Sequence, residues 1–411
     1  MESRLKTSSV EFQLLLACLR WPLTDLERDQ ICGLVRGALD MSVFIDLVLH
    51  HQVVPLVFRN LSDAARGKAP EAMLSNLRSK ALTASKQTLG RVAETIHLSE
   101  KMQRDGIAVR VLKGAALSLQ AYRDVTLQHS VDIDLLVPIE EVFDAEKVLL
   151  ERGYTRTIPL ARLTPRRVSW LLNHSHHLHF FHPQTHQHVE LHWGLTPNPF
   201  KHERFQPPFR SMTHLQIGSK QIPSLSPQDM FLHACVHGAG HSWSLLKWLA
   251  QIAAMMRMMT HEELSAIATR AAKFGVAPEF IAAITLVDRY RLADISAAED
   301  FLEPSRAKDR IVKRSREAIE GGPGYSNHAI ADFRDAWLAA SSFRYRRNLI
   351  ERSIIREESW DLIDLPDSLF FGYVLVAPIA WLRHRNQART RRAVTGLRPR
   401  NERAGLSSAG G

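Results

Sequence analysis

The sequence predicts an α+β fold, in which a small mixed β-sheet is flanked along the chain by helical regions. Two stretches with helical apolar spacing enclose a middle stretch of short alternating or apolar runs bounded by glycine and proline. The final stretch is polar and rich in arginine. We therefore expect an N-terminal helical region (1–104), an α/β core (105–225), a helical domain (226–382) and a basic, disordered tail (383–411).

The composition excludes several classes of protein. With 45% hydrophobic and 23% charged residues among 411, the chain is globular rather than disordered or collagen-like. Its three cysteines are odd in number and far apart, which argues against a disulfide framework and favours the reducing cytoplasm. No stretch reaches the roughly 20 apolar residues of a membrane-spanning helix. We therefore expect a cytoplasmic protein without a transmembrane segment.

Helices are expected on both sides of the core. Residues 71–104 contain no proline and predict one long helix, and residues 44–56 also have helical spacing. Ser226 and Pro227 form a typical helix start, because serine caps the first turn and proline is tolerated at the first helical position. Helices are expected from there to about residue 290.

Short strands are expected within the core. Residues 107–112 alternate, with β-branched side chains at every second position, and predict a strand. Lys113 and Gly114 end this strand before a short helix at 115–122. Residues 131–137 predict a second strand, which is apolar except for two carboxylates. The remaining expected elements are a helix at 139–152 and a hairpin whose strands lie at 177–181 and 187–193.

Two aspartates on the second strand point to a metal site. Residues i and i+2 of a strand share a face, so Asp132 and Asp134 place two carboxylates side by side. Two like charges in an apolar strand are unfavourable unless a cation lies between them. Mg²⁺ is typically held by one or two carboxylates together with substrate phosphates. The alternative is an exposed edge strand with both aspartates in solvent.

Glu190 is the third carboxylate of interest. The run from His188 to Trp193 alternates, which puts Glu190 on the same face as His188 and His192. If this strand pairs with residues 131–137, the three carboxylates form one cluster that can hold two metal ions. The alternative is a strand glutamate paired with a lysine or an arginine.

The Lys113-Gly114 turn precedes a predicted helix. Glycine lets the backbone approach a phosphate, and a helix N-terminus offers N–H groups and a partial positive charge. The turn therefore suits the phosphates of a nucleotide, and an ordinary turn is the alternative.

Together these motifs resemble the nucleotidyltransferase superfamily of the DNA polymerase β type. Within it, they are similar to a bacterial family of uncharacterised nucleotidyltransferases often found near polysaccharide gene clusters. The resemblance implies transfer of a nucleoside monophosphate from an NTP such as ATP to a hydroxyl acceptor, with release of pyrophosphate and with Mg²⁺ or Mn²⁺ as cofactor. It covers roughly residues 40–260. It rests on Leu112-Lys-Gly114, Asp132-Ile-Asp-Leu-Leu-Val137, Glu190-Leu-His-Trp193 and the run from Leu232 to His241.

The resemblance also implies roles for individual residues. The catalytic metal ligands would be Asp132, Asp134 and Glu190, and the nucleotide would be bound by Lys113, Gly114, Ala115 and His192. Three positions depart from the family pattern: Ala115 replaces a serine, Gln128 an arginine and Gln251 an aspartate. Two other functions therefore stay open. One is a non-catalytic descendant that binds a nucleotide or a polymer, and the other is a glycosyltransferase that uses Asp-x-Asp to hold a metal–sugar nucleotide.

A histidine-rich stretch has the composition of a metal-binding tract. It contains His174, His176, His177 and His179. Alternation along a strand would split these residues between two faces, and no cysteine or nearby aspartate completes a tetrahedral set. We therefore expect these imidazoles to line or border an anion-binding cleft rather than to hold zinc.

The net charge of +10 is concentrated at one end of the chain. Residues 383–403 contain eight arginines and one glutamate, so seven of the ten net positive charges lie there. We expect this tail to make at most a weak contact with a polyanion or a membrane surface. The charge does not predict a basic face on the core.

Overall fold

The computed structural model describes residues 9–203, 205, 213–321, 333, 336–337 and 342–379. The expected basic tail at 383–411 lies outside the described residues. The chain forms two compact units, and each unit is assembled from separate stretches. The first comprises residues 1–103, 109–134 and 207–326, and the second comprises residues 104–108, 135–206 and 327–411.

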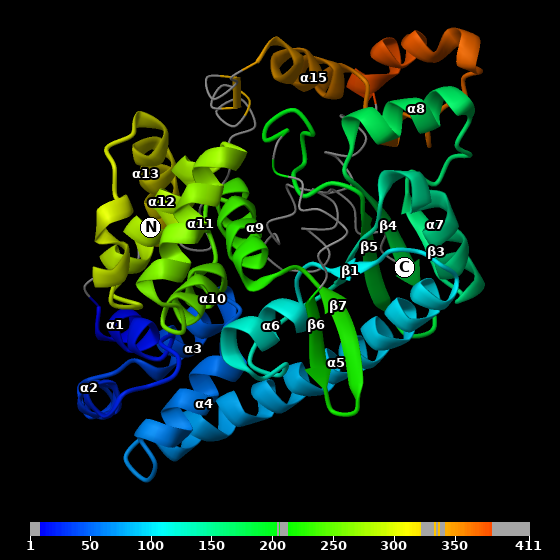
Figure 1. The fold of residues 1–411 in the computed structure, drawn as a ribbon. Coiled ribbons are helices and arrows are strands. Elements are labelled where there is room, and N and C mark those ends of the chain that lie inside the picture. Colours follow the sequence, from blue (N-terminus) through cyan, green and yellow to red (C-terminus); the bar gives the residue numbers. More distant parts are fainter. Residues whose placement is uncertain are drawn as a thin grey trace. The chain divides into compact units, whose positions relative to one another are not determined.

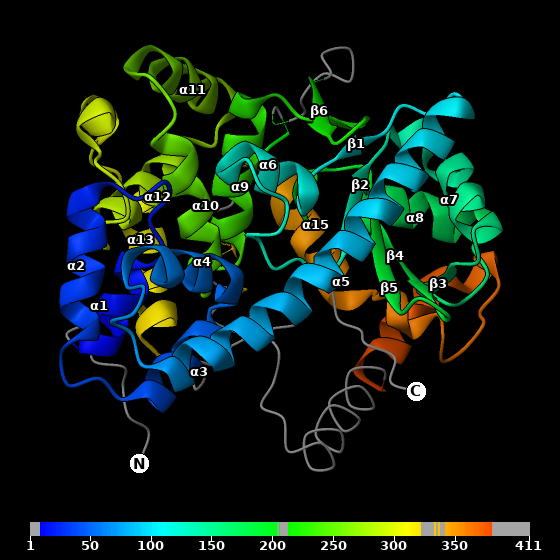
Figure 2. The ribbon, with the colours of Figure 1, turned by 90° about the horizontal axis from the view of Figure 1, so that it is seen from below.

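The first unit is mainly helical. Its N-terminal helices are α1 (Val10–Ala17), α2 (Asp25–Val35), α3 (Met41–His50), α4 (Val54–Ala64) and α5 (Glu71–Arg104, whose last residue belongs to the second unit). The others are α6 (Ala115–Tyr122), α9 (Pro227–Gly240), α10 (Leu246–Met256), α11 (His261–Phe274), α12 (Ala277–Arg289) and α13 (Arg306–Gly321). Helices α9, α10 and α12 pack against one another and supply much of the unit's apolar core (Figure 1). Figure 2 shows α5, the 34-residue helix that the sequence predicts, along its whole length.

The helical spacing noted at 44–56 is confirmed, but it is divided between two helices, α3 and α4. Helix α3 ends at His50, and Gln52 adopts a left-handed φ of 56° that no continuing helix tolerates. Pro55 lies in the first turn of α4, where its missing N–H leaves no bond unmade. Apolar spacing alone does not reveal this break, since both helices bury the same kind of side chain.

The helix start predicted at Ser226 is confirmed. The Ser226 hydroxyl accepts a hydrogen bond from the backbone N–H of Asp229 at 3.2 Å, and Pro227 opens α9. The following helix, α10, is buried along its length from Leu249 to Met256.

The first unit also contains four strands or parts of strands. They are β1 (Arg110–Val111), the beginning of β2 (Ile133–Leu136), β6 (Thr213–Ile217) and β7 (Lys220–Ser224), in the order β2-β1-β7-β6. Strand β1 is parallel to β7, whereas β6 and β7 form an antiparallel pair. The backbone N–H of Leu112 donates to the carbonyl of Asp134 at 3.1 Å, which ties the end of β1 to β2. The strand predicted at 107–112 is present as β1, but β1 covers only Arg110–Val111.

The second unit combines helices with a set of strands that includes an antiparallel hairpin. Its helices include α7 (Val142–Glu151), α8 (Pro165–His174) and α15 (Phe343–Ile354), with 3₁₀ turns η1 (Ile139–Glu141), η4 (Glu357–Ser359) and η5 (Asp367–Gly372). Its strands are β3 (Thr155–Ile158), β4 (His177–His182), β5 (Gln187–His192) and the end of β2, in the order β3-β4-β5-β2.

The hairpin and the pairing beside β2 are confirmed. Strands β4 and β5 are antiparallel, with His177 opposite His192 and His179 opposite Glu190. The backbone N–H of Val137, which follows β2, donates to the carbonyl of His192 at 2.9 Å. Strand β5 is therefore the neighbour of β2. Strands with helices before and after them in the chain confirm the α+β class.

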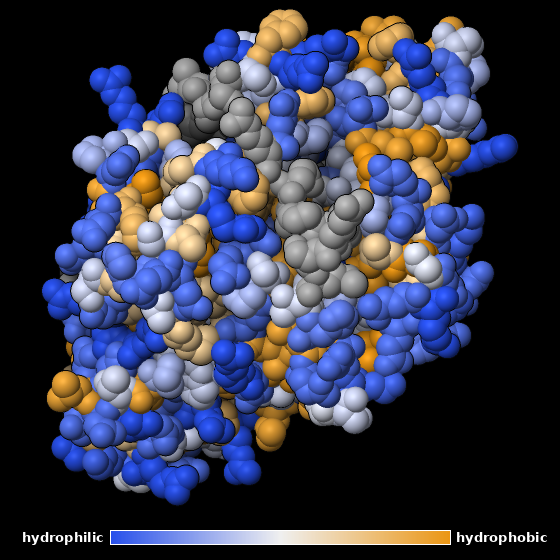
Figure 3. Space-filling model, viewed as in Figure 1, coloured by the Kyte–Doolittle hydropathy of each residue, from blue (hydrophilic) through white to orange (hydrophobic). Residues whose placement is uncertain are grey.

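The surface carries no extended apolar area on the face drawn in Figure 3, where hydrophilic residues predominate and the apolar ones form small separate groups. Among the helices that the structure describes, none has the length and hydropathy needed to cross a bilayer.

Candidate functional site

Asp134 is a buried carboxylate in an apolar strand. All four residues of β2 are buried, and the Asp134 side chain is 1% exposed. The alternative of an exposed edge strand with aspartates in solvent is therefore wrong for Asp134. Lys113 Nζ lies 2.7 Å from Asp134 Oδ1. A buried carboxylate needs such a cation, because removal of the charge from water costs several kcal/mol unless the charge is paired.

The two aspartates and the Lys-Gly turn line one recess in the first unit. Five of the residues singled out in the sequence meet there, and the opposite wall comes from α5. The recess has a volume of about 10 Å³, which is the size of a single water or ion. It is lined by Lys113, Gly114, Ala115, Asp132 and Asp134 together with Thr88, Arg91, Val92, Thr95, Val111, Ser130 and Ile133.

Gly114 holds a backbone conformation that few other residues adopt. Its φ and ψ are 53° and −120°, at the position that precedes the first residue of α6. The expected short helix at 115–122 is confirmed as α6. The turn therefore directs the start of α6 and the Lys113 side chain toward the recess that Asp134 lines.

Sequence reasoning missed four polar residues of this recess, of which Ser130 and Arg91 bear most on the site. The Ser130 hydroxyl donates to the carbonyl of Asp132 at 2.8 Å and lies 3.4 Å from where a Cβ on Gly114 would be. It brings a hydroxyl beside the Lys113-Gly114 turn. Its position two residues before Asp132 is the sequence feature that could have identified Ser130 as a site residue. Arg91 of α5 carried no signal, since it is one of several basic residues on a long polar helix.

Glu190 and His192 lie together on β5 in the second unit. His192 Nε2 is 3.2 Å from Glu190 Oε2, which confirms that the two side chains share a face. His179 Nδ1 of β4 lies 3.7 Å from Glu190 Oε1. The carboxylate is thus set against imidazoles, and these rings can orient it or share a proton with it.

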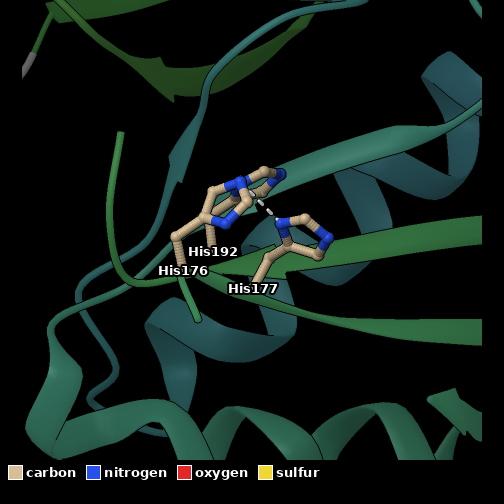
Figure 4. A group of neighbouring side chains, drawn as sticks. All are labelled: His176, His177 and His192. Carbon is tan, nitrogen blue, oxygen red and sulfur yellow. Dashed lines mark hydrogen bonds between the residues drawn. The ribbon is translucent and has the colours of Figure 1, made fainter. Parts of the chain in front are cut away.

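Three imidazoles meet at the start of the hairpin, as Figure 4 shows for His176, His177 and His192. His176 precedes β4, so strand alternation does not fix its direction, and the neighbouring strand β5 contributes His192. The expectation that alternation splits the histidines overlooked both points. His174 lies elsewhere, stacked on Trp170 in α8 with Nε2 2.9 Å from Glu351 Oε2.

Burial depresses the basicity of His176. The pKa of this imidazole is well below its usual value, first because of burial and then because of its neighbours His177 and His192. A neutral ring can donate or accept a hydrogen bond and can bind a metal.

A larger cavity of about 560 Å³ lies within the second unit. Its wall combines arginines with aromatic rings, and the guanidinium of Arg166 lies 5.1 Å from the ring centre of Phe371. The lining includes Arg166, Trp170, His174, Arg344, Arg347 and Phe371. Of the lining residues, only His174 belongs to a motif identified in the sequence, the histidine-rich stretch.

Two comparisons with known proteins bear on these residues. A family model described as an uncharacterised nucleotidyltransferase matches residues 37–291, which is more than half of the chain. The matched segment contains all seven residues that the sequence analysis assigned to the site. No curated protein matches the chain.

Proposed function

This chain belongs to the family of uncharacterised nucleotidyltransferases, and from that premise we propose that it is a metal-dependent enzyme. It would transfer a nucleoside monophosphate from an NTP to a hydroxyl acceptor and release pyrophosphate. The single observation that carries the proposal is the recess in which Asp132, Asp134 and the Lys113-Gly114 turn meet.

The donor set fits a hard divalent cation. Asp132 and Asp134 offer carboxylate oxygens, and Asp134 already lies against the cation of Lys113. We propose that Glu190 is the third ligand, as the resemblance to the family implies. Mg²⁺ or Mn²⁺ bound there would neutralise charge on the triphosphate.

Lys113 would change partner when the nucleotide binds. Its ammonium group compensates Asp134 in the structure, 2.7 Å away. A divalent ion held by Asp132 and Asp134 would supply that compensation, and the Lys113 ammonium group would then be available to a phosphate oxygen. The backbone at Gly114 and Ala115 begins α6, so its N–H groups suit the same phosphates, and Ser130 adds a hydroxyl beside them.

In the transfer itself, the acceptor hydroxyl oxygen forms a bond to the α-phosphorus as the bond to the departing pyrophosphate breaks. One carboxylate of the set accepts the hydroxyl proton. His192 lies 3.2 Å from Glu190, where it would orient that carboxylate or contact the nucleotide. The acceptor is a hydroxyl compound whose identity the residues do not specify. The buried, unpaired state of all three cysteines supports a cytoplasmic reaction.

The second candidate is a non-catalytic nucleotide-binding protein. It is favoured by the family positions that lack a charged or hydroxyl group, at Ala115, Gln128 and Gln251. Gln251 lies in α10 with 2% of its surface exposed, so an amide is buried where the family has an acid. Such a protein would bind NTP without turnover.

The test is release of pyrophosphate from each of the four NTPs with Mg²⁺ or Mn²⁺, across a panel of hydroxyl acceptors that includes sugars and RNA ends. We expect turnover that is lost in Asp134→Asn and kept in Asp144→Asn, whose carboxylate is exposed and pairs with Lys147. Metal-independent NTP binding without turnover would favour the second candidate. Preference for a nucleotide sugar over NTP would favour the glycosyltransferase.

A further inference from the structure

A chain of close contacts links four imidazoles and one carboxylate in the second unit. His176 Nε2 lies 2.8 Å from His177 Nδ1, and His177 Nε2 lies 2.8 Å from His179 Nε2. Glu190 lies next, 3.7 Å from His179 Nδ1 and 3.2 Å from His192 Nε2. The ring centres of His177 and His192 are 4.9 Å apart, so the two ends of this series of contacts lie close together.

The backbone builds this arrangement. His177 and His192 are directly opposite each other in the β4–β5 ladder, so their side chains share a face. The carbonyl of His176 accepts the N–H of Trp193 at 2.9 Å and that of Gly194 at 3.3 Å, which holds His176 beside the end of β5. A Cβ on residue 194 would lie 3.3 Å from the Cβ of His176, so glycine leaves room for that imidazole.

The cluster is costly without a further partner. His176 Nδ1 is buried and has no hydrogen-bond partner among the residues that the structure describes. Neutral imidazoles are the form in which histidine binds metals.

We propose that His176, His177 and His192 form a binding site for a transition-metal ion of the zinc class. One ring nitrogen from each of the three residues lies within 4.8 Å of the others. In a tetrahedral zinc site with Zn–N bonds of ~2.0–2.1 Å, two ligand nitrogens lie roughly 3.4 Å apart. Small rotations of the three side chains therefore suffice. Three nitrogen ligands select zinc, cobalt, nickel or copper over magnesium, which prefers oxygen.

The contacts around the three rings match those of a metal-bound imidazole. Such a ring usually donates its second N–H to a carboxylate or another acceptor, which fixes its orientation. Nε2 of His192 meets Glu190, and Nε2 of His177 meets His179. Glu190 and His179 would thus be positioning residues for this ion. Glu190 and His192 belong to both proposed sites, but none of the three zinc ligands is a proposed magnesium ligand.

The test uses the full chain, freed of any histidine tag and of metal by chelation, and titrated with Zn²⁺ and Co²⁺. We expect one ion per chain, with the visible absorption of four-coordinate cobalt and a higher melting temperature when zinc is bound. His176→Gln and His192→Gln should each weaken zinc binding at least 100-fold. The matched control is His188→Gln, an exposed histidine of the same strand, which should bind as the wild type does.

Several results would overturn the proposal. They are no stoichiometric binding by the wild type, equal binding by all three variants, or an octahedral cobalt spectrum, which would point to water and carboxylate ligands. If a variant does not fold, the zinc stoichiometry and the cobalt spectrum of the wild type test the proposal by themselves. Asp132→Asn/Asp134→Asn should keep full zinc binding, so failure of the zinc site and failure of the proposed transferase site are separable.

Discussion

Lys113 and Asp134 form a buried ion pair, with Nζ 2.7 Å from Oδ1 and the Asp134 side chain 1% exposed. The pair joins the residue that ends the first core strand to the carboxylate of β2. Under the proposed function, a divalent ion held by Asp132 and Asp134 would compensate Asp134 in place of this ammonium group.

Substitution of Lys113 by methionine should therefore destabilise the protein. Lys113→Met leaves Asp134 buried without its cation and should lower the free energy of unfolding by about 3 kcal/mol, measured by urea denaturation. Mg²⁺ should raise the melting temperature of this variant more than that of the wild type, because the ion replaces the lost ammonium group.

A matched control for that substitution exists on α7. Lys147 also lies 2.7 Å from a carboxylate, Asp144, but its side chain is 71% exposed. Lys147→Met should lower the free energy of unfolding by less than about 1 kcal/mol. Mg²⁺ should not raise the melting temperature of this variant more than that of the wild type. Equal losses in the two variants would contradict the role given to the buried pair.

Substitution by alanine should destabilise the protein at one glycine of α9 and have little effect at another. A Cβ on Gly238 would lie 2.2 Å from Nε1 of Trp243, which is fully buried. Gly238→Ala should lower the free energy of unfolding by at least about 2 kcal/mol, because neither the helix nor the indole can move away cheaply. At Gly240 a Cβ meets nothing within 4 Å, so Gly240→Ala should change stability by less than about 1 kcal/mol. Thermal or urea unfolding of both variants checks this, and similar values would show that the packing of Trp243 is not the constraint.

Glu357 should make stability depend on pH. Burial raises the pKa of this carboxyl to about 7, although Arg352 acts in the opposite direction. The folded state therefore holds a proton that the unfolded state has lost, and this contribution to stability is complete below about pH 4.5 and disappears as the pH rises to about 7. The change is at most about 3 kcal/mol.

Urea denaturation between pH 4.5 and 8 measures this dependence. Glu357→Gln should flatten that part of the curve, whereas Glu140→Gln, at an exposed position, should leave it unchanged. A curve of unchanged slope in Glu357→Gln would assign the dependence to other groups.

Much of the core could be predicted from the sequence, because short alternating or apolar runs bounded by glycine and proline leave few alternatives. The hairpin at 177–192 and the strand with Asp134 followed from these patterns. The pairing of β5 with β2 is a long-range contact, which the sequence raised only as the condition under which three carboxylates would cluster.

Other features depend on contacts that no local pattern encodes. The break between α3 and α4 is set by the backbone of Gln52 and by Pro55, within a run whose spacing remains helical. Arg91 reaches the recess because α5 lies beside it. His176 joins His192 through the hydrogen bond between its carbonyl and Trp193. These three features can be seen only in the folded structure.

Calorimetric titration of the wild type with each Mg²⁺·NTP tests whether Asp132 and Asp134 hold a metal–nucleotide complex. We expect one nucleotide to bind per chain, and only in the presence of the divalent ion. Asp132→Asn/Asp134→Asn should lower the affinity at least 100-fold, whereas Asp144→Asn should leave it unchanged. Metal-independent binding, or equal affinity in the double variant and the wild type, would contradict the assignment of Asp132 and Asp134 to a metal–nucleotide site.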